Sequence, residues 1–330
     1  MSESCLISDS SAEAIPSLNT AILFLLFNRA DTTCQIFKAI RQAKPCRLYI
    51  AADGPRSNVE NEKLKCEETR KIATAVDWQC EVRTLFREKN LGCRQAVSSA
   101  IDWFFENEEQ GIILEDDCLP SQSFFWYCQE LLEHYKNDER IMVIAGSNFQ
   151  KGEKVTGHSY YFSRYNHCWG WAAWRRSWKF YDHEMSCWPE FRTEQGLRDV
   201  AGGSKLFVRY WQRIFDSVAA YEIDSWAYIW TFSCWAQRGL TCLPNVNLVR
   251  NIGFGEGATH TKNADSPFCI EAHEISLPLR HPELVFRHTV ADKYTDRHHF
   301  LIKPLNLLVT VTKEKFPLFA TVIRVVKSLL

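Results

Sequence analysis

The chain has 330 residues, which is long enough for one large α/β domain or for a core domain with an elaborated second half. Hydrophobic residues make up 46% and charged residues 24%, so a globular chain is expected and a disordered one is not. A net charge of -1 leaves no surplus of Lys and Arg to neutralise phosphates, which excludes binding of nucleic acid through a broadly basic surface.

The first half of the chain predicts strands that alternate with helices. Residues 21–27 form a short continuous apolar run, which is typical of a strand buried on both faces. Asp31 then stands where it can N-cap a helix that runs to about residue 43. The same patterns of apolar and polar residues predict further strands at 47–52, 80–86, 111–117 and 142–146, and helices from about 60 to 76, 90 to 105 and 124 to 135. This alternation indicates a Rossmann-like, mostly parallel sheet flanked by helices.

The regular alternation of strand and helix patterns ends after residue 150. Residues 160–190 are dense in aromatic side chains, and Trp171, Trp174 and Trp178 recur at helical spacing, which favours a helix packed into the core. Trp169 and Gly170 are the members of this segment that we expect to line a site. A strand is predicted from residue 240, and a glycine-rich loop that ends in His260 follows it.

The thirteen cysteines contain no CxxC pair, so neither a zinc site nor a disulfide framework is indicated. Their odd number fits a reducing compartment. The polar N-terminal residues lack the pattern of a signal peptide, and no apolar run approaches the ~18–20 residues that span a bilayer. We therefore expect a cytoplasmic protein. The apolar and basic segment 304–330 suits either a peripheral helix at the inner membrane surface or packing onto the core.

Polar or charged residues follow each of the first four predicted strands. In open α/β sheets, ligands bind in the crevice outside the carboxyl ends of the strands, so these residues are expected to share a site. They are Arg29 after the first strand, Asp53 after the second, Arg87 after the third, and Glu115, Asp116 and Asp117 at the end of the fourth.

The acidic triplet Glu115–Asp117 is the strongest single signal. Three adjacent carboxylates at the end of an apolar strand repel one another and are costly to desolvate unless a cation balances them. Mg²⁺ and Mn²⁺ take carboxylate oxygens together with substrate phosphates, and so neutralise a diphosphate leaving group. Because neighbouring carboxylates point in different directions, one or two of them would bind the metal. The alternative is a solvated acidic loop.

Each of the remaining candidates has a structural alternative. His260 is either a ligand for Mn²⁺ or a surface residue. Asp53 and Arg29 either contact a nucleotide or form turns. Asp224, with Glu222 beside it, is either the general base for an acceptor hydroxyl or the N-cap of the Trp-rich helix that follows.

Five stretches together resemble the GT-A type nucleotide-diphospho-sugar transferases, especially the branch related to N-acetylglucosaminyltransferase I. The resemblance covers roughly residues 20–262, and its most specific part is the acidic triplet followed by Pro and two Phe. The stretches are AILFLLFNRAD, RLYIAADGP, REKNLGCRQAVSSAIDWFFE, GIILEDDCLPSQSFFWYC and SWAYIWTFSCWAQRGLTCLPNVNLVRNIGFGEGATHT.

The resemblance implies a sheet that holds a nucleotide-sugar, usually with Mn²⁺, and inversion at the anomeric carbon. It implies Asp117 as the direct metal ligand and Asp116 beside the ribose or metal waters. Arg29 and Asp53 match the family's nucleotide-binding residues, and His260 is similar to its late histidine near the diphosphate. The sequence departs from the family at Ala227, where relatives carry an acidic residue, so the identity of the base is open.

The function expected from the sequence is an inverting, metal-dependent glycosyltransferase of the hexosyl- or N-acetylhexosaminyltransferase class. It would move a sugar from a UDP-sugar or similar donor to a glycan or lipid-linked acceptor with Mn²⁺ or Mg²⁺. The alternatives are a nucleotidyltransferase and a non-catalytic nucleotide-sugar-binding protein. The predicted organisation is a flexible segment 1–19, a nucleotide-sugar-binding half 20–150, an acceptor-side half of the same domain 151–262, and a C-terminal extension 263–330.

Overall fold

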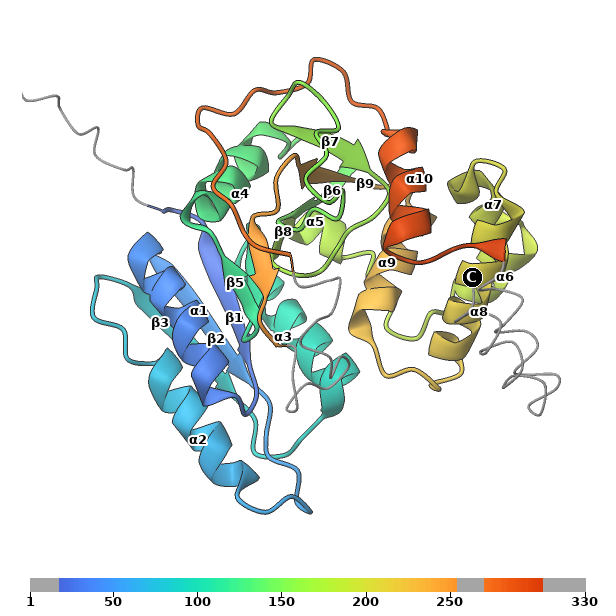
Figure 1. Ribbon diagram of the computed structural model, residues 1–330. Coiled ribbons are helices and arrows are strands. Elements are labelled where there is room, and N and C mark those ends of the chain that lie inside the picture. The colour runs from blue at the N-terminus through green and yellow to red at the C-terminus, as the bar shows by residue number, and fades with distance from the viewer. Residues whose placement is uncertain (1–17, 254–269, 305–330) are drawn as a thin grey trace, which may run out of the picture.

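The computed structural model describes residues 18–253 and 270–304, and it shows a mixed α/β fold built around one large sheet (Figure 1). The strand order in this sheet is β3-β2-β1-β4-β8-β6-β9-β7. Its strands are β1 (Ala21–Leu26), β2 (Arg47–Ala52), β3 (Glu81–Phe86), β4 (Gln110–Glu115), β6 (Ile141–Ala145), β7 (Tyr160–Ser163), β8 (Trp171–Trp174) and β9 (Leu240–Pro244).

Helices cover both faces of the sheet. One face carries α1 (Ala30–Ala43), α2 (Glu62–Ala73) and α4 (Gln122–His134). The other carries α3 (Gly92–Asn107), α5 (Arg175–Trp178), α6 (Trp188–Thr193), α7 (Gly196–Ala201), α8 (Lys205–Ala219) and α9 (Trp226–Ala236). Successive side chains of β1 point to opposite faces of the sheet, so Phe24 belongs to the core on one face and Leu25 to the core on the other. Both faces are apolar and are therefore covered by helices. The expected mostly parallel sheet flanked by helices is confirmed.

The strands of the first half pair in parallel, and the sheet becomes mixed where the second half joins it. Strands β3, β2, β1 and β4 are parallel neighbours. Strand β8 inserts between β4 and β6 and runs antiparallel to both, whereas β9 is parallel to β6 and antiparallel to β7. Strands from before and after residue 150 in the sequence therefore form a single sheet.

Two local predictions were wrong. Trp171 and Trp174 lie in strand β8, not in a helix, and only the short helix α5 follows them up to Trp178. Both faces of β8 are buried, so its tryptophans pack on opposite sides and the helical spacing was coincidental. Asp31 does not cap α1, because that helix begins at Ala30 with Arg29 in the cap position and Asp31 lies in its first turn.

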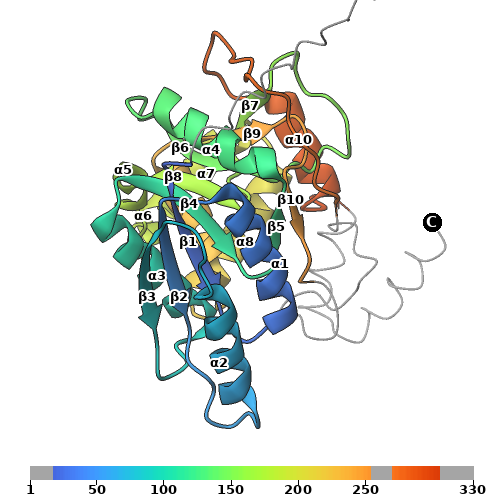
Figure 2. The same ribbon diagram turned by 90° about the vertical axis from the view of Figure 1, so that its left-hand side faces the viewer.

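A small ribbon and one further helix complete the described structure. Strand β5 (Cys118–Pro120) follows β4 closely in the chain and pairs antiparallel with β10 (Val249–Asn251). Helix α10 (Thr289–His298) lies beside β7 at the far edge of the sheet, as Figures 1 and 2 both show. Among the described residues, no helix combines the length and apolar character that crossing a membrane requires.

Candidate functional site

The acidic triplet and Arg29 meet where two neighbouring strands end. The pairing of β1 with β4 places Leu25 opposite Glu115, so the turns that follow these strands lie side by side. The Arg29 guanidinium forms an ion pair with Asp116, and its Nη1 lies 2.9 Å from Oδ2 of Asp117. The backbone N–H of Phe27 donates to Asp116 Oδ2 at 3.2 Å. The two turns are thereby joined by charge-assisted hydrogen bonds.

Carboxyl groups outnumber cationic side chains where β1 and β4 end. Burial lowers the pKa of Arg29, but Asp116 and Asp117 outweigh that effect and raise it above its ordinary value. Burial, with Asp117 and Asp116 beside it, raises the pKa of Glu115. Within residues 18–253 and 270–304, no side chain offers Glu115 a hydrogen bond or a direct ion pair. One guanidinium thus faces three carboxyl groups, an arrangement that favours the binding of a further cation.

The backbone at Gly253 passes directly over these charges. Ile252 donates its N–H to the carbonyl of Asp117 at 2.8 Å. A Cβ at Gly253 would lie only 2.3 Å from Asp117 Oδ2 and 2.7 Å from Arg29 Nη1, so a residue without a side chain is required. Sequence reasoning did not single out Gly253, although it opens the glycine-rich segment. His260, the second predicted metal ligand, lies outside the described residues.

Two further predicted carboxylates converge on the N-terminus of α3. Asp53 accepts hydrogen bonds from the N–H groups of Leu91 at 3.0 Å and Gly92 at 3.2 Å. Asp224 accepts one from the N–H of Arg94 at 3.2 Å. These contacts satisfy donors that a helix start leaves unpaired, and they place negative charge at its positive end.

The alternative role considered for Asp224, as N-cap of α9, was wrong. Ser225 is the cap of that helix, and its side chain accepts from the N–H of Tyr228 at 3.5 Å. Asp224 instead reaches across to α3, and its Oδ2 lies 3.3 Å from where a Cβ on Gly92 would stand. A long-range contact of this kind cannot be inferred from a local capping pattern.

Cys93 links the two groups of carboxylates. Burial raises the pKa of its thiol to about 12, and the next causes are the charges of Glu115, Asp224, Asp117 and Asp53, in that order. The thiol therefore stays protonated among four carboxyl groups, two from each group. No sequence signal distinguished Cys93 from the other cysteines, and in the described residues all cysteines are free thiols.

Arg87 lies on the α3 side of this site. Its Nη2 donates to Ser99 Oγ at 2.7 Å. Burial raises the pKa of Asp53, and the N–H groups of Leu91, Gly54 and Gly92 and then the charge of Arg87 oppose that rise. Asp53 also accepts from Asn90 Nδ2 at 2.9 Å. Asp53 is thus hydrogen-bonded to the loop before α3 and to the first residue of α3, and Arg87 is hydrogen-bonded to α3.

Gly170 supports the ribbon behind the acidic triplet. Its carbonyl accepts from the N–H of Gly146 at 2.8 Å, and with φ at +63° its Cβ would stand 2.7 Å from Val249 Cγ2. Trp169 is partly buried, with its ring 5.4 Å from that of Phe149. Burial and then the charge of Glu115 raise the pKa of the neighbouring Cys168.

The side chains at the triplet suit a hard divalent cation shared with a substrate. The described residues contain no group of three or more His, Cys, Asp and Glu side chains placed to hold a metal by themselves. Mg²⁺ and related ions are commonly bound through one or two carboxylates plus substrate phosphates, so a full protein cage is not required. Asp117, whose side chain is 17% exposed, matches that pattern, and so does Glu115, whose carboxyl group accepts no hydrogen bond from the described side chains.

No model of a known protein family matches the sequence, and no curated protein matches it either. Among solved structures, the chain is similar to glucosyl-3-phosphoglycerate synthase from Mycobacterium tuberculosis in complex with Mn²⁺, UDP and glucosyl-3-phosphoglycerate. The identity is 12% and the TM-score 0.31, over 49% of this chain and 58% of that one, which is less than two thirds of its length.

Two further solved structures are similar over less than half of this chain. A UTP-bound UGPase from Acinetobacter baumannii has 10% identity and a TM-score of 0.30, over 49% of this chain and 77% of that one. A UDP-glucose pyrophosphorylase complexed with UDP-glucose has 13% identity and a TM-score of 0.25, over 44% and 62%. At these values the likeness is partial and assigns no role to any residue of this chain.

Proposed function

We propose that this chain is a metal-dependent, inverting glycosyltransferase of GT-A type that uses a UDP-sugar donor. The observation that carries the proposal is the excess of carboxyl groups at the joined ends of β1 and β4, where one guanidinium, that of Arg29, faces the three carboxyl groups of Glu115–Asp117. Such a site suits a divalent cation and a diphosphate together. The acceptor would be a glycan or a lipid-linked saccharide.

Each group at the site has a role in this proposal. Asp117 and Glu115 would hold Mn²⁺ or Mg²⁺, which when bound stabilises the negative charge of the departing diphosphate. Asp116 pairs with the guanidinium of Arg29, which would meet a phosphate oxygen of the donor. Asp53 and Arg87 shape the loop before α3, where the nucleoside would lie. Trp169 and Gly170 would border the sugar, and His260, outside the described residues, is the second proposed metal ligand.

Asp224 is the proposed general base, because its carboxylate lies at the N-terminus of α3, where Asp53 also binds. We expect Asp224→Asn to lower kcat by about 100-fold or more while the donor KM changes little, since general bases contribute roughly 10²–10⁴-fold. The amide oxygen of Asn still accepts from the Arg94 N–H, so the fold is expected to persist. Steady-state kinetics with the donor identified below measures both parameters.

Glu222→Gln is the matched control, since Glu222 lies two residues away and its Oε2 accepts from Ser217 Oγ at 2.8 Å. It should leave kcat unchanged. A normal kcat for Asp224→Asn would remove Asp224 from the mechanism. In that case the base belongs to another carboxylate, as the presence of Ala227 at the family's acidic position already allows.

A nucleotidyltransferase fits the structure less well. Such enzymes cradle a nucleoside triphosphate in a glycine-rich, basic loop after the first strand. Here β1 ends at Leu26 and α1 begins at Ala30, so the turn has no room for such a loop. A non-catalytic sugar-nucleotide-binding protein differs from the proposal only in turnover.

A panel of nucleotide-sugars tests the proposed function directly. With Mn²⁺ present, we expect at least one UDP-sugar to raise the Tm of the protein, because a ligand that binds only the native state stabilises it by mass action. The same UDP-sugar should be hydrolysed slowly without an acceptor. Stabilisation without hydrolysis would indicate a binding protein, and stabilisation by nucleoside triphosphates with pyrophosphate release would indicate a nucleotidyltransferase.

A further inference from the structure

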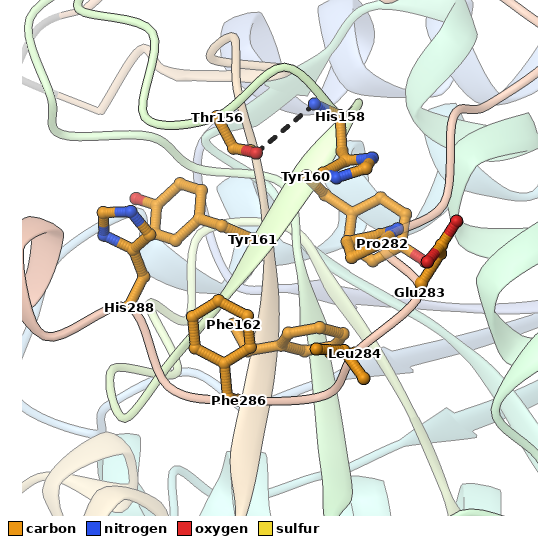
Figure 3. Close-up of a pocket in the computed structure, with 10 residues that line it drawn as sticks. All are labelled: Thr156, His158, Tyr160, Tyr161, Phe162, Pro282, Glu283, Leu284, Phe286 and His288. Atoms are coloured by element: carbon orange, nitrogen blue, oxygen red, sulfur yellow. Dashed lines mark hydrogen bonds between the residues drawn. The ribbon is translucent and has the colours of Figure 1, made fainter.

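A cavity lies at the β7 edge of the sheet, between β7 and the segment 280–288 (Figure 3). Its volume is about 400 Å³, within the range of roughly 300–1,000 Å³ that ligand pockets occupy. The three aromatic residues of β7, residues 160–162, form one side of the cavity, and the segment with Leu284 and Phe286 forms the other. Thr156, His158, Glu283 and His288 add polar groups.

The segment 280–288 is hydrogen-bonded to β7 at both of its ends. Between these ends it lies away from β7, and this leaves the cavity. Ser159 donates its N–H to the carbonyl of Arg280 at 2.9 Å, and His288 donates its N–H to the carbonyl of Phe162 at 2.7 Å. The bridge between Phe162 and Arg287 is parallel. An edge strand is thus covered by a bowed segment and is not left open to another chain.

Side-chain contacts keep the bowed segment in place. The His281 ring lies between Tyr160 and Glu130, with Nδ1 2.8 Å from the tyrosine hydroxyl and Nε2 2.9 Å from the carboxylate. At the other end, Arg287 donates from Nη1 to the carbonyl of Val200 at 2.9 Å. Both flanks of the cavity are therefore anchored to buried parts of the fold.

The polar groups of the cavity suit an uncharged ligand with hydroxyl groups. None of its described lining residues is Lys or Arg, so it offers no ammonium or guanidinium group to a phosphate or a carboxylate. His288 Nδ1 accepts from the N–H of Ala291 at 3.2 Å, which places the ring proton on Nε2 and makes that atom a hydrogen-bond donor. The Thr156 hydroxyl can donate to or accept from hydroxyls of a ligand, and the Glu283 carboxylate can accept from them.

The apolar wall of the cavity is unusually exposed. Phe286 is 61% exposed and Leu284 is 69% exposed, and both belong to the same extended segment. An exposed aromatic ring beside convergent polar groups can pack against the C–H face of a sugar ring while its hydroxyls are hydrogen-bonded. A purely apolar ligand would leave the histidine and carboxylate groups without partners.

We infer that the cavity between β7 and residues 280–288 is a binding site for a neutral saccharide, with Phe286 as the stacking platform. The site is separate from the acidic triplet, because β7 lies four strands from β4, a distance of roughly 19 Å at the usual ~4.8 Å spacing. The inference therefore does not rest on the proposed sugar transfer. A saccharide chain bound here would be held at a point remote from the donor.

An array of immobilised oligosaccharides, both neutral and sialylated, tests the inference with the full-length protein. We expect retention on at least one neutral oligosaccharide, and calorimetry with that oligosaccharide then gives the Kd. Phe286→Ala should raise this Kd at least tenfold, whereas Phe286→Trp, which keeps an aromatic platform, should retain binding. Because Phe286 is exposed, neither change is expected to disturb folding, and circular dichroism checks this.

Two control variants distinguish binding in this cavity from non-specific adhesion and from binding at the acidic triplet. Val290→Ala removes an equally exposed apolar side chain that does not line the cavity, and it should leave the Kd unchanged. Asp117→Asn should also leave it unchanged, so failure of the donor site and failure of this site are distinguishable. Retention of sialylated oligosaccharides alone, or of none, would overturn the inference. An equal loss for Phe286→Ala and Val290→Ala would do the same, because it would show non-specific adhesion.

Discussion

Asp117→Asn is expected to weaken the binding of UDP in the presence of Mn²⁺ strongly. The change keeps the size of the side chain beside Gly253 but removes the charge that would hold the cation, while the amide oxygen can still accept from Arg29. We expect the Kd to rise about 100-fold or more, which corresponds to a loss of about 3 kcal/mol. Isothermal titration calorimetry with UDP at saturating Mn²⁺ measures the effect.

Asp77→Asn is the control for charge alone. Asp77 forms a surface ion pair with Arg41 in which both side chains are at least half exposed, and its removal should leave UDP affinity unchanged. Should Asp117→Asn bind UDP as tightly as the unaltered protein, the metal assignment at the triplet is wrong. Glu115→Gln would then show whether the neighbouring carboxylate holds the cation alone.

Arg164→Ala is expected to cost about 3–5 kcal/mol in free energy of unfolding, the range found when one member of a buried ion pair is removed. The Arg164 guanidinium is 4% exposed and lies 2.5 Å from Asp296 and 4.0 Å from Asp292, both on α10. It also lies over the Phe207 ring, 3.8 Å from the centroid. Its loss leaves buried negative charge and removes this packing. Urea denaturation followed by tryptophan fluorescence measures the change.

The same substitution at the surface is the matched control. Arg238 pairs with Asp199 at 3.2 Å, and both side chains are more than 70% exposed, so Arg238→Ala should cost less than about 1 kcal/mol. A double variant, Arg164→Ala with Asp296→Ala, should recover part of the loss because it removes both charges. Equal effects for Arg164→Ala and Arg238→Ala would show that the buried network contributes little.

The first half of the fold could be predicted because parallel strands covered on both faces are continuous apolar runs in the sequence. Strands β1, β2 and β4 appear at the expected positions within one or two residues, and so does the exposed edge strand β3. The meeting of Arg29 with the triplet also follows from strand order, since polar residues at neighbouring strand ends must lie close together.

The second half could not be predicted because long-range pairing decides it. Strand β8 has only four residues, and its place between β4 and β6 depends on contacts that local spacing does not encode. Likewise, nothing local indicates that Asp224 binds the start of α3, more than a hundred residues earlier in the chain. The same holds for Gly253, whose importance depends on what lies opposite it.

The position of β8 has a consequence for how the protein is made. Strand β4 is complete at Glu115, but its second neighbour in the sheet is not synthesised until Trp171–Trp174. At about 5–20 residues per second, a ribosome leaves that edge of β4 without its native partner for several seconds. An apolar strand with an open edge is prone to pair with other chains. Slower translation between these two strands should therefore lower the yield of soluble protein, and chaperones that bind nascent chains should matter most in this interval.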